Sequence, residues 1–495
     1  MAQGSLRAKT ISGVFWSALQ KFGVMAISFI SNIILARLLS PDDFGCIGML
    51  AIFIVISSTF IDGGFGSALI QKKEPTEEDY STIFYWNMIL SLVLYGILFI
   101  SAPAIARYYE IPLLSDVLRV EGIVLIINAL SIIQNNRLRK QLRFRKLAII
   151  DIVSAVISIT VTIVLAANGW GIWALVAQQL MLCSITTLIL WLTNKWHPKW
   201  VFSWQSFREL FNFGLFILIA NLVNTFCNNI QGLLIGKIYN PATMGYYSQG
   251  KKLEELSSTS ISSVVDRVAY PVLAEMQNDL PRMVRSLSRF ITSLAYLTIP
   301  LMLLFILLAD PMIHLIYSEK WLPAVPYFQI LCIAGIAISL QGINYYAIAA
   351  IGRSGKLLLW TLVKRGVGLV LVVGGLAAFG MYGLLAGMVV TSYLIYFINA
   401  SLVHRYVGYK VQRQMLDLLP IALIAVAAFV LAFWVGKLWV INKFAMGGIQ
   451  LALFLVVYLG LSYLFKLQAF RNFQEIFQDV LKSFKNKIHP IKPQA

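Results

Sequence analysis

Charged residues are scarce in this chain of 495 residues: they make up 13% of it, whereas 59% of its residues are hydrophobic. A soluble globular domain carries about 25% charged residues. Nearly uncharged runs of 18 residues or more recur along the whole sequence, and each can cross a hydrocarbon core of about 30 Å as a helix. Such continuous runs exclude a membrane β-barrel, whose strands appear as short alternating segments. The sequence therefore predicts an all-α integral membrane protein.

Cysteine and histidine are equally rare, with four residues of each. The cysteines form no Cys-x-x-Cys pair and fall inside apolar runs, which is typical of small buried side chains. The histidines lie far apart, so no metal site is predicted. The sequence contains no GxxxxGK[ST] phosphate-binding loop, no GxSxG and no HExxH. Because the connections between the apolar runs are also short, we predict no enzymatic activity and no cofactor.

Acidic residues are outnumbered by basic ones, 22 to 40, which gives a formal net charge of +18. This excess could suggest a nucleic-acid partner, but 28 of the 40 basic residues lie at the termini or in every second connection. That distribution is the positive-inside signal of a polytopic membrane protein. It predicts about 14 transmembrane helices between residues 13 and 465, with both termini in the cytoplasm. We therefore expect membrane lipids as partners, and no nucleic acid.

An internal repeat relates the first six predicted spans to the next six. The stretch LARLLSPDDFG, residues 35–45, recurs as IGKIYNPATMG, residues 235–245, so that Pro41 aligns with Pro241 and Gly45 with Gly245. Weaker matches continue, in order, as the offset drifts from 200 to 210. Each half has an even number of spans and begins in the cytoplasm. The halves should therefore be two six-helix lobes related by pseudo-two-fold symmetry along the membrane normal, with a substrate site at their interface.

The repeat defines the predicted domain organisation. We expect an N-lobe over 1–195, a cytoplasmic linker over 196–209, a C-lobe over 210–405, two extra C-terminal helices over 406–467 and a cytoplasmic amphipathic tail over 468–495.

Polar residues recur at helical spacing in the first span of each half. An offset of 200 places Lys21, Ser28 and Ser31 opposite Asn221, Asn228 and Gln231, on one face of each helix. Such stripes are costly in hydrocarbon unless they face a hydrated cavity, although polar residues also join helices. The predicted substrate-binding residues of this cavity are Gln20, Lys21, Ser28, Ser31, Asn221, Asn224, Asn228, Gln231 and Lys252.

Further charged residues near these stripes are candidates for ion coupling or gating: Asp62, Glu255, Asp266 and Arg267. Asp62 could pair with Lys21, and Glu255 lies within one turn of Lys251 and Lys252. The pair Asp266 and Arg267 could equally be a gate or an interface anchor.

Two other groups of basic residues have simpler interpretations. The cluster RLRKQLRFRK, residues 137–146, favours membrane orientation and lipid headgroup contact over recognition of a phosphate-bearing ligand. Lys364 and Arg365 lie one or two turns into a predicted span, and we expect both to snorkel to the membrane surface.

Three stretches carry a family resemblance: SGVFWSALQKFGVMAISFISNIILARLLSPDDFG (12–45), DGGFGSALIQ (62–71) and NPATMGYYSQGKKLEEL (240–256). They resemble the polysaccharide-flippase branch of the multidrug, oligosaccharidyl-lipid and polysaccharide (MOP) exporter superfamily, in particular the Wzx-type flippases of O-antigen and colanic-acid-like glycans. The resemblance implies a twelve-helix core of two lobes around a V-shaped, often cationic cavity, plus two extra helices.

The function implied by this resemblance is translocation of an undecaprenyl-pyrophosphate-linked oligosaccharide across the bacterial inner membrane by alternating access. H⁺ or Na⁺ would be the coupling ion, and a polysaccharide polymerase and other assembly proteins would be partners. In this interpretation Lys21 and Lys252 contact the anionic head, and the asparagine stripe contacts sugar hydroxyls. The alternative is a multidrug or small-metabolite ion antiporter of the same superfamily.

Overall fold

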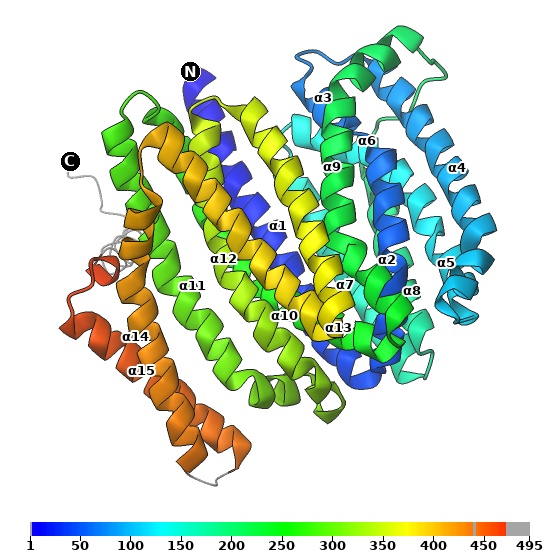
Figure 1. Ribbon diagram of the computed structural model, residues 1–495. Helices are drawn as coiled ribbons and strands as arrows, with labels where there is room; N and C mark the ends of the chain where they lie inside the picture. The colour runs from blue at the N-terminus through cyan, green and yellow to red at the C-terminus, as the bar shows by residue number, and fades with distance from the viewer. Residues whose placement is uncertain (1, 439–441, 472–495) are drawn as a thin grey trace, which may run out of the picture. The chain divides into compact units, whose positions relative to one another are not determined.

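The structure, a computed structural model, describes residues 2–438 and 442–471, and it is helical with no β-strand in those ranges (Figure 1). Eleven helical segments in the described residues are long and apolar enough to span a membrane. One of them, α13 (Ser354–Val407), holds two spans because the chain kinks at Phe379 and Gly380. Adding the more polar helices α6 and α10 gives the predicted number of spans, so the all-α membrane fold is confirmed.

The chain forms two compact units, residues 1–248 and 249–495. The helices of the first unit are α1 (Ala2–Leu38), α2 (Pro41–Asp62), α3 (Phe65–Gln71), α4 (Glu77–Tyr109), α5 (Leu113–Glu121), α6 (Ile123–Lys140), α7 (Phe144–Ala167), α8 (Ile172–Thr193), α9 (Trp204–Ile238) and the start of α10 (Pro241–Glu275). Because α9 packs against α2, α3 and α4, the first unit extends past the predicted linker at 196–209. The lobe boundaries taken from the repeat remain a prediction.

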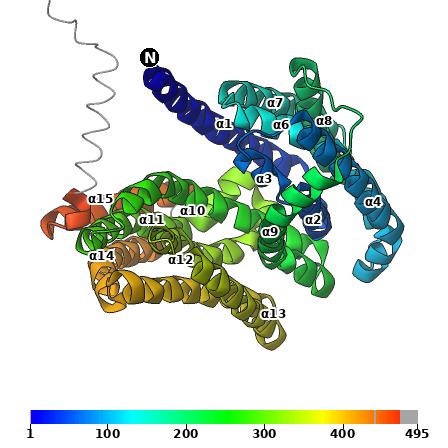
Figure 2. The ribbon, with the colours of Figure 1, turned by 90° about the horizontal axis from the view of Figure 1, so that it is seen from above.

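The second unit contains the rest of α10, α11 (Leu280–Tyr317), the short 3₁₀ helix η1 (Glu319–Ala324), α12 (Val325–Ala350), α13, α14 (Val411–Leu438) and α15 (Lys443–Leu464). Figure 2 shows α11, α12 and α14 side by side, in agreement with their contacts. The two extra helices, α14 and α15, share one apolar core with α11. The Tyr458 hydroxyl of α15 also donates to the backbone oxygen of Tyr296 in α11 at 2.8 Å. Most of the predicted tail lies outside the described residues.

The start of the second helix in each half follows the same local chemistry. Ser40 and Asp43 form a capping box before α2: the Ser40 hydroxyl accepts from the Asp43 amide, and the Asp43 carboxylate accepts from the Ser40 amide. At the start of α10, the Asn240 side chain accepts from the Thr243 amide at 2.9 Å. A proline is the first residue of both helices.

These two helix starts cross in direct backbone contact within the first unit. A Cβ on Gly45 would lie 1.8 Å from the carbonyl oxygen of Pro241, and a Cβ on Gly245 would lie 2.1 Å from the carbonyl oxygen of Pro41. Only glycine permits this approach. The reciprocal pattern is what a local two-fold axis produces, so it supports the pairing of residues found in the repeat.

One predicted span is not continuous. The apolar run 115–136 is divided at Gly122, where α5 ends and α6 begins. The crossing helix α6 instead continues to Lys140. The prediction of one uninterrupted helix was therefore wrong, and the first residues of the basic cluster belong to the end of α6.

Candidate functional site

The polar stripe of α1 is divided between two environments. The Gln20 amide donates a hydrogen bond to the Asp151 carboxylate of α7. Ser31 is buried and accepts from the Gln178 amide of α8 at 3.2 Å. Lys21 and Ser28, by contrast, are exposed. Gln20 and Ser31 thus join helices of the first unit, whereas Lys21 and Ser28 are available to solvent, lipid or ligand.

Asp62 ends α2 at a backbone break made by two glycines. Gly63 and Gly64 have φ of 56° and 73°, the left-handed region that favours glycine. A Cβ on Gly64 would also lie 2.5 Å from the carbonyl oxygen of Gly214 in α9. The glycine run therefore both interrupts the helix and allows α9 to approach it.

Asp62 has neighbours that the sequence did not predict. The position that a Cβ on Gly66 would occupy is 3.3 Å from the Asp62 Oδ1 atom and 2.9 Å from the Asn136 Nδ2 atom of α6. Arg139 follows Asn136 by one helical turn on α6, and Asp62 and Asp151 are acidic residues of α2 and α7, which both contact α6. No ion pair within 4.0 Å joins Arg139 to either carboxylate, or Lys21 to Asp62, among the described residues.

We call these side chains the N-unit polar site: Gln20, Asp62, Asn136, Arg139 and Asp151. They come from α1, α2, α6 and α7. The site holds two acidic residues, one basic residue and two amides, which is the composition expected where ions or charged groups interact inside a membrane bundle.

Most of the basic cluster that contains Arg139 supports local structure. The Arg137 guanidinium contacts the Glu77 carboxylate at 3.0 Å and lies over the Trp196 ring at 5.1 Å from its centroid. Lys140 donates to backbone oxygens at the end of α3, including that of Leu69 at 2.9 Å. Lys146 donates to the backbone oxygen of Thr193 at 2.6 Å and to the Asn194 side chain at 2.7 Å. Arg145 lies over the Trp16 ring.

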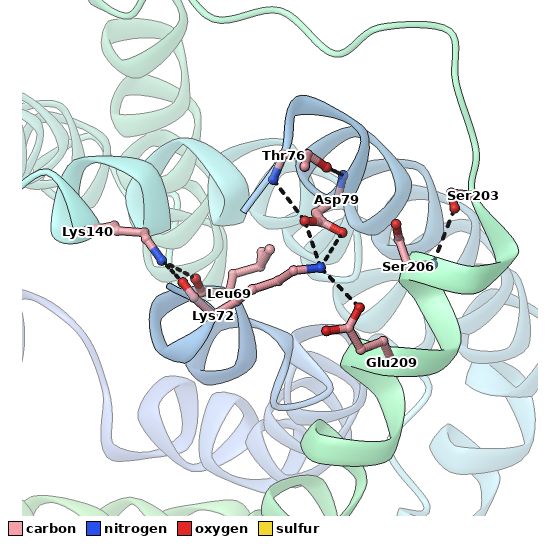
Figure 3. Close-up of polar contacts among 8 residues, drawn as sticks. All are labelled: Leu69, Lys72, Thr76, Asp79, Lys140, Ser203, Ser206 and Glu209. Carbon is pink, nitrogen blue, oxygen red and sulfur yellow. Dashed lines mark hydrogen bonds and ion pairs between the residues drawn. The ribbon is translucent and has the colours of Figure 1, made fainter. Parts of the chain in front are cut away.

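A second polar cluster ties α4 to the beginning of α9 (Figure 3). The Lys72 ammonium is 3.0 Å from the Asp79 carboxylate and 3.1 Å from that of Glu209. Asp79 is 1% exposed and also accepts from the Thr76 amide at 2.8 Å, whereas Glu209 is 61% exposed. Although partial burial lowers the pKa of Lys72, the carboxylates of Asp79 and Glu209 outweigh it and raise that pKa above its usual value. Lys72 therefore stays charged and fixes two helices.

The polar stripe of α9 likewise contains both exposed and buried residues. Asn221 and Asn228 are exposed, and Asn224 is half-buried. Gln231 is buried, and its amide donates to the backbone oxygen of Cys227 in its own helix at 3.3 Å. Asn221 and Asn228 are exposed, whereas Gln231 does not present its side chain to solvent, and the lining of a cavity by this stripe stays a prediction.

On α10, Lys252 and Glu255 are exposed, and Glu255 pairs with Lys251 at 3.7 Å, as the spacing predicts. The side chains of Asp266 and Arg267 lie outside the described residues. The neighbouring carboxylate, Glu254, is the buried one: it is 3% exposed and packs so closely on α12 that a Cβ on Gly335 would lie 2.4 Å from its Oε1 atom. Helical spacing alone placed Glu254 off the predicted stripe.

Lys364 does not snorkel, so that prediction was wrong. It is 4% exposed, and its ammonium donates to the Asn399 Oδ1 atom at 2.7 Å. The Asn399 amide in turn donates to the backbone oxygen of Gln341 in α12 at 3.2 Å. An inward-facing acceptor on the second half of α13 therefore holds the lysine inside the second unit.

The free cysteines agree with the sequence interpretation. Cys46 and Cys332 are buried, and Cys183 and Cys227 are half-buried, without disulfides. The described residues contain no group of three or more histidine, cysteine, aspartate or glutamate residues placed to hold a metal ion.

Comparison with known proteins agrees with this architecture. TuaB of Bacillus subtilis (strain 168), a teichuronic acid biosynthesis protein, is 28% identical over 72% of this chain and 74% of its own length. WzxC of Escherichia coli (strain K12), a lipopolysaccharide biosynthesis protein, is 22% identical over 67% of this chain and 68% of its own.

Two solved structures share the fold. The lipid II flippase MurJ in an inward closed conformation superposes with a TM-score of 0.74 at 16% identity, over 91% of this chain and 98% of MurJ. An inward-facing multidrug resistance MATE transporter of the MOP superfamily gives 0.59 at 14% identity, over 77% of this chain and 95% of its own. Residues 34–326 also match the family described as "Polysaccharide biosynthesis protein". The chain therefore belongs to the polysaccharide biosynthesis protein family and has the fold of the MOP superfamily.

Proposed function

We propose that this protein moves an oligosaccharide linked to undecaprenyl pyrophosphate from the cytoplasmic to the outer leaflet of the bacterial inner membrane. The observation that carries the proposal is the family membership. The names of its relatives concern teichuronic acid biosynthesis, succinoglycan biosynthesis transport and lipopolysaccharide biosynthesis. A repeat unit of O-antigen, capsule or exopolysaccharide is the substrate class that these products share.

The chemistry of such a substrate matches the exposed polar residues. A pyrophosphate needs cations, and sugar hydroxyls need amides and hydroxyls. Lys21 and Ser28 on α1, Asn221 and Asn228 on α9, and Lys252 on α10 are all exposed. We assign the anionic head to Lys21 and Lys252, and the sugar to Ser28 and the asparagines. Asn224, and less directly the buried Gln231, would support the exposed asparagines of α9 in this role.

Transport against a gradient needs a coupled ion, for which Asp62 and Glu255 are our candidates, with Asp266 and Arg267 as a gate. A carboxylate inside a membrane bundle binds H⁺ or Na⁺ only when it can exchange with water. Both termini would face the cytoplasm, as the basic connections predict. A polysaccharide polymerase and other assembly proteins would act on the exported unit. We propose no covalent chemistry for this chain.

Neutralising both candidate cations is expected to reduce glycan export about tenfold or more, since each charge-assisted contact to phosphate contributes about 1.5–3 kcal/mol. The measurement is surface glycan in a deletion strain that carries Lys21→Ala with Lys252→Ala, at matched protein level. Lys73→Ala, an exposed lysine in a connection, is the control and should export normally.

Export at the wild-type level in the double variant would refute the two-lysine assignment. Resistance to cationic dyes without any rescue of glycan export would instead favour the small-molecule antiporter and refute the proposed function.

A further inference from the structure

Glu254 is a buried carboxyl group on α10 to which the proposed function gives no role. The residue is 3% exposed, and its Oε1 atom is out of reach of water and has no hydrogen-bond partner among the described residues. No basic side chain in that part of the chain forms an ion pair with it within 4.0 Å. Its neighbour Glu255, by contrast, is exposed and pairs with Lys251 at 3.7 Å. Glu254 is therefore enclosed by protein without a paired cation.

Two helices of the second unit enclose this carboxyl group. A Cβ on Gly335 of α12 would lie 2.4 Å from the Glu254 Oε1 atom. A Cβ on Gly250, one turn before Glu254 on α10, would lie 3.2 Å from the Phe328 backbone nitrogen of α12. Glycine on both helices thus permits their close approach. We call the contact of these four residues the α10–α12 seam. Because water does not reach Oε1, the seam has no space for a hydrated metal ion, whereas a proton needs none.

The groups beside the seam do not stabilise a negative charge. On α12, Cys332 and Ser339 lie one turn before and one turn after Gly335, on the same face. The Cys332 thiol, the titratable group of that face, is fully buried, and the Ser339 hydroxyl donates to the Gly335 backbone oxygen at 2.9 Å. Ser258, one turn after Glu254, is 1% exposed, and its hydroxyl has no partner in the described part of the chain. An ionised carboxylate is costly in such surroundings, so Glu254 carries its proton in this conformation.

We propose that Glu254 binds the proton whose movement is coupled to transport of the glycan lipid, and that the α10–α12 seam opens when this proton leaves. The inference rests on the proposed function and adds a residue to its candidates for ion coupling. Loss of the proton leaves a carboxylate without a cation, which needs water. Water reaches the carboxylate only if α10 and α12 separate, and the proton passes to that water. Proton binding therefore shifts this pair of helices between a closed and an open arrangement.

Glutamine at position 254 separates this role from packing alone. The side chain in Glu254→Gln keeps the shape and polarity of the protonated acid, so the variant should fold as the wild type does. It cannot release a proton, and a ligand that does not distinguish two states shifts neither of them. A proton gradient should therefore have no effect on transport by the variant. If Glu254 served packing alone, the variant and the wild type would respond to the gradient alike.

The first test uses the purified full-length protein in vesicles that contain a polyprenyl-diphosphate oligosaccharide with a fluorescent label on the sugar. Translocation is measured with and without an imposed pH gradient. We expect the gradient to raise the rate of the wild type about threefold or more, and to leave the rate of Glu254→Gln unchanged within about 20%. Glu275→Gln, at an exposed glutamate that ends the same helix, is the matched control and should respond as the wild type does.

The second test detects the proton itself by infrared spectroscopy at neutral pH in a detergent without ester groups. The wild-type spectrum minus that of Glu254→Gln should contain the carbonyl band of a carboxylic acid, whereas the subtraction of Glu275→Gln should give carboxylate bands. If Glu254→Gln does not fold, the subtraction is made with Glu254→Asp, which keeps the acid and displaces its band.

Carboxylate bands for Glu254 would overturn the proposal, and so would an equal response of Glu254→Gln and the wild type to the pH gradient. Stimulation of the wild type by a sodium gradient alone would also overturn it. A carboxylic-acid band from Glu254, in a protein that translocates no glycan lipid under any gradient, would instead refute the proposed function while the proton-binding site remained.

Discussion

Alanine at Gly45 or Gly245 is expected to destabilise the first unit by about 3 kcal/mol, the upper range for inserting one methyl group into a packed contact. The new Cβ would lie 1.8 Å from the Pro241 carbonyl oxygen in the first variant and 2.1 Å from the Pro41 carbonyl oxygen in the second. The neighbouring atoms are backbone, so no side-chain rotation relieves the overlap. The two helix starts must separate. The measurement is the apparent Tm in detergent, with the monodisperse fraction on size-exclusion chromatography.

Gly96→Ala is the control, because a Cβ added at Gly96, in the interior of α4, would have no neighbouring atom within 4 Å. It should be neutral or stabilising by up to about 1 kcal/mol. The double variant of Gly45 and Gly245 should lose less than the sum of the single losses, since one separation relieves both overlaps. Additive losses, or a Gly45→Ala variant as stable as Gly96→Ala, would contradict the reciprocal crossing.

The Asp79→Ala substitution is expected to cost about 3 kcal/mol, because it leaves the Lys72 ammonium without its buried partner and removes the Asp79 half of the capping box of α4, in which Thr76 remains the N-cap. Because Lys72 keeps its contact with Glu209, the loss of stability should lie near the lower end of the range for breaking a buried ion pair. Glu209→Gln removes the other, exposed partner of the same ammonium and should cost about 1 kcal/mol or less.

The two variants are compared by apparent Tm in the same detergent. A loss for Glu209→Gln as large as that for Asp79→Ala would contradict the assignment of most of the stabilisation to the buried pair of Lys72 and Asp79. Figure 3 shows both carboxylates on the one ammonium, so the pair of substitutions separates their contributions directly.

Most of the spans, and the equivalence of the two helix starts at Pro41 and Pro241, could be predicted from the sequence for identifiable physical reasons. Continuous apolar runs are an unambiguous signal of membrane helices, and cap chemistry at Ser40 and Asn240 marks equivalent helix starts. The alignment paired Gly45 with Gly245, but it did not predict that both glycines lie at a close backbone contact. Gly122 was not recognised as a helix break, because apolar residues recur on both sides of it, such as Val120 and Ile123, and no proline signals the end of α5.

The site was predictable only in part. Periodicity identified the polar faces of α1 and α9, but it does not say which helix a face will meet. Gln20 therefore forms a hydrogen bond with Asp151, and Ser31 forms one with Gln178, although no local sequence pattern indicates either partner. The basic residues of the segment 137–146 look alike in sequence, whereas Lys140 and Lys146 have separate partners that depend on where α3 and the connection after α8 pass. Non-local packing decides such assignments.

Lys364 illustrates the same limit. A lysine near the end of an apolar run usually reaches the membrane surface, and nothing in its neighbourhood along the chain argues otherwise. Its acceptor, Asn399, is 35 residues away on the second half of α13. The kink at Gly380 brings the two together, and that kink is visible in the sequence only as a glycine between apolar residues.

The most direct test of the proposed function is translocation by the purified protein in vesicles. Vesicles would contain a polyprenyl-diphosphate oligosaccharide with a fluorescent label on the sugar, and dithionite would quench the label that faces outward. With a proton or sodium gradient imposed, vesicles that contain the protein should expose additional label and quench beyond the outward-facing fraction of empty vesicles. Quenching that stops at the level of empty vesicles under every gradient would contradict the account.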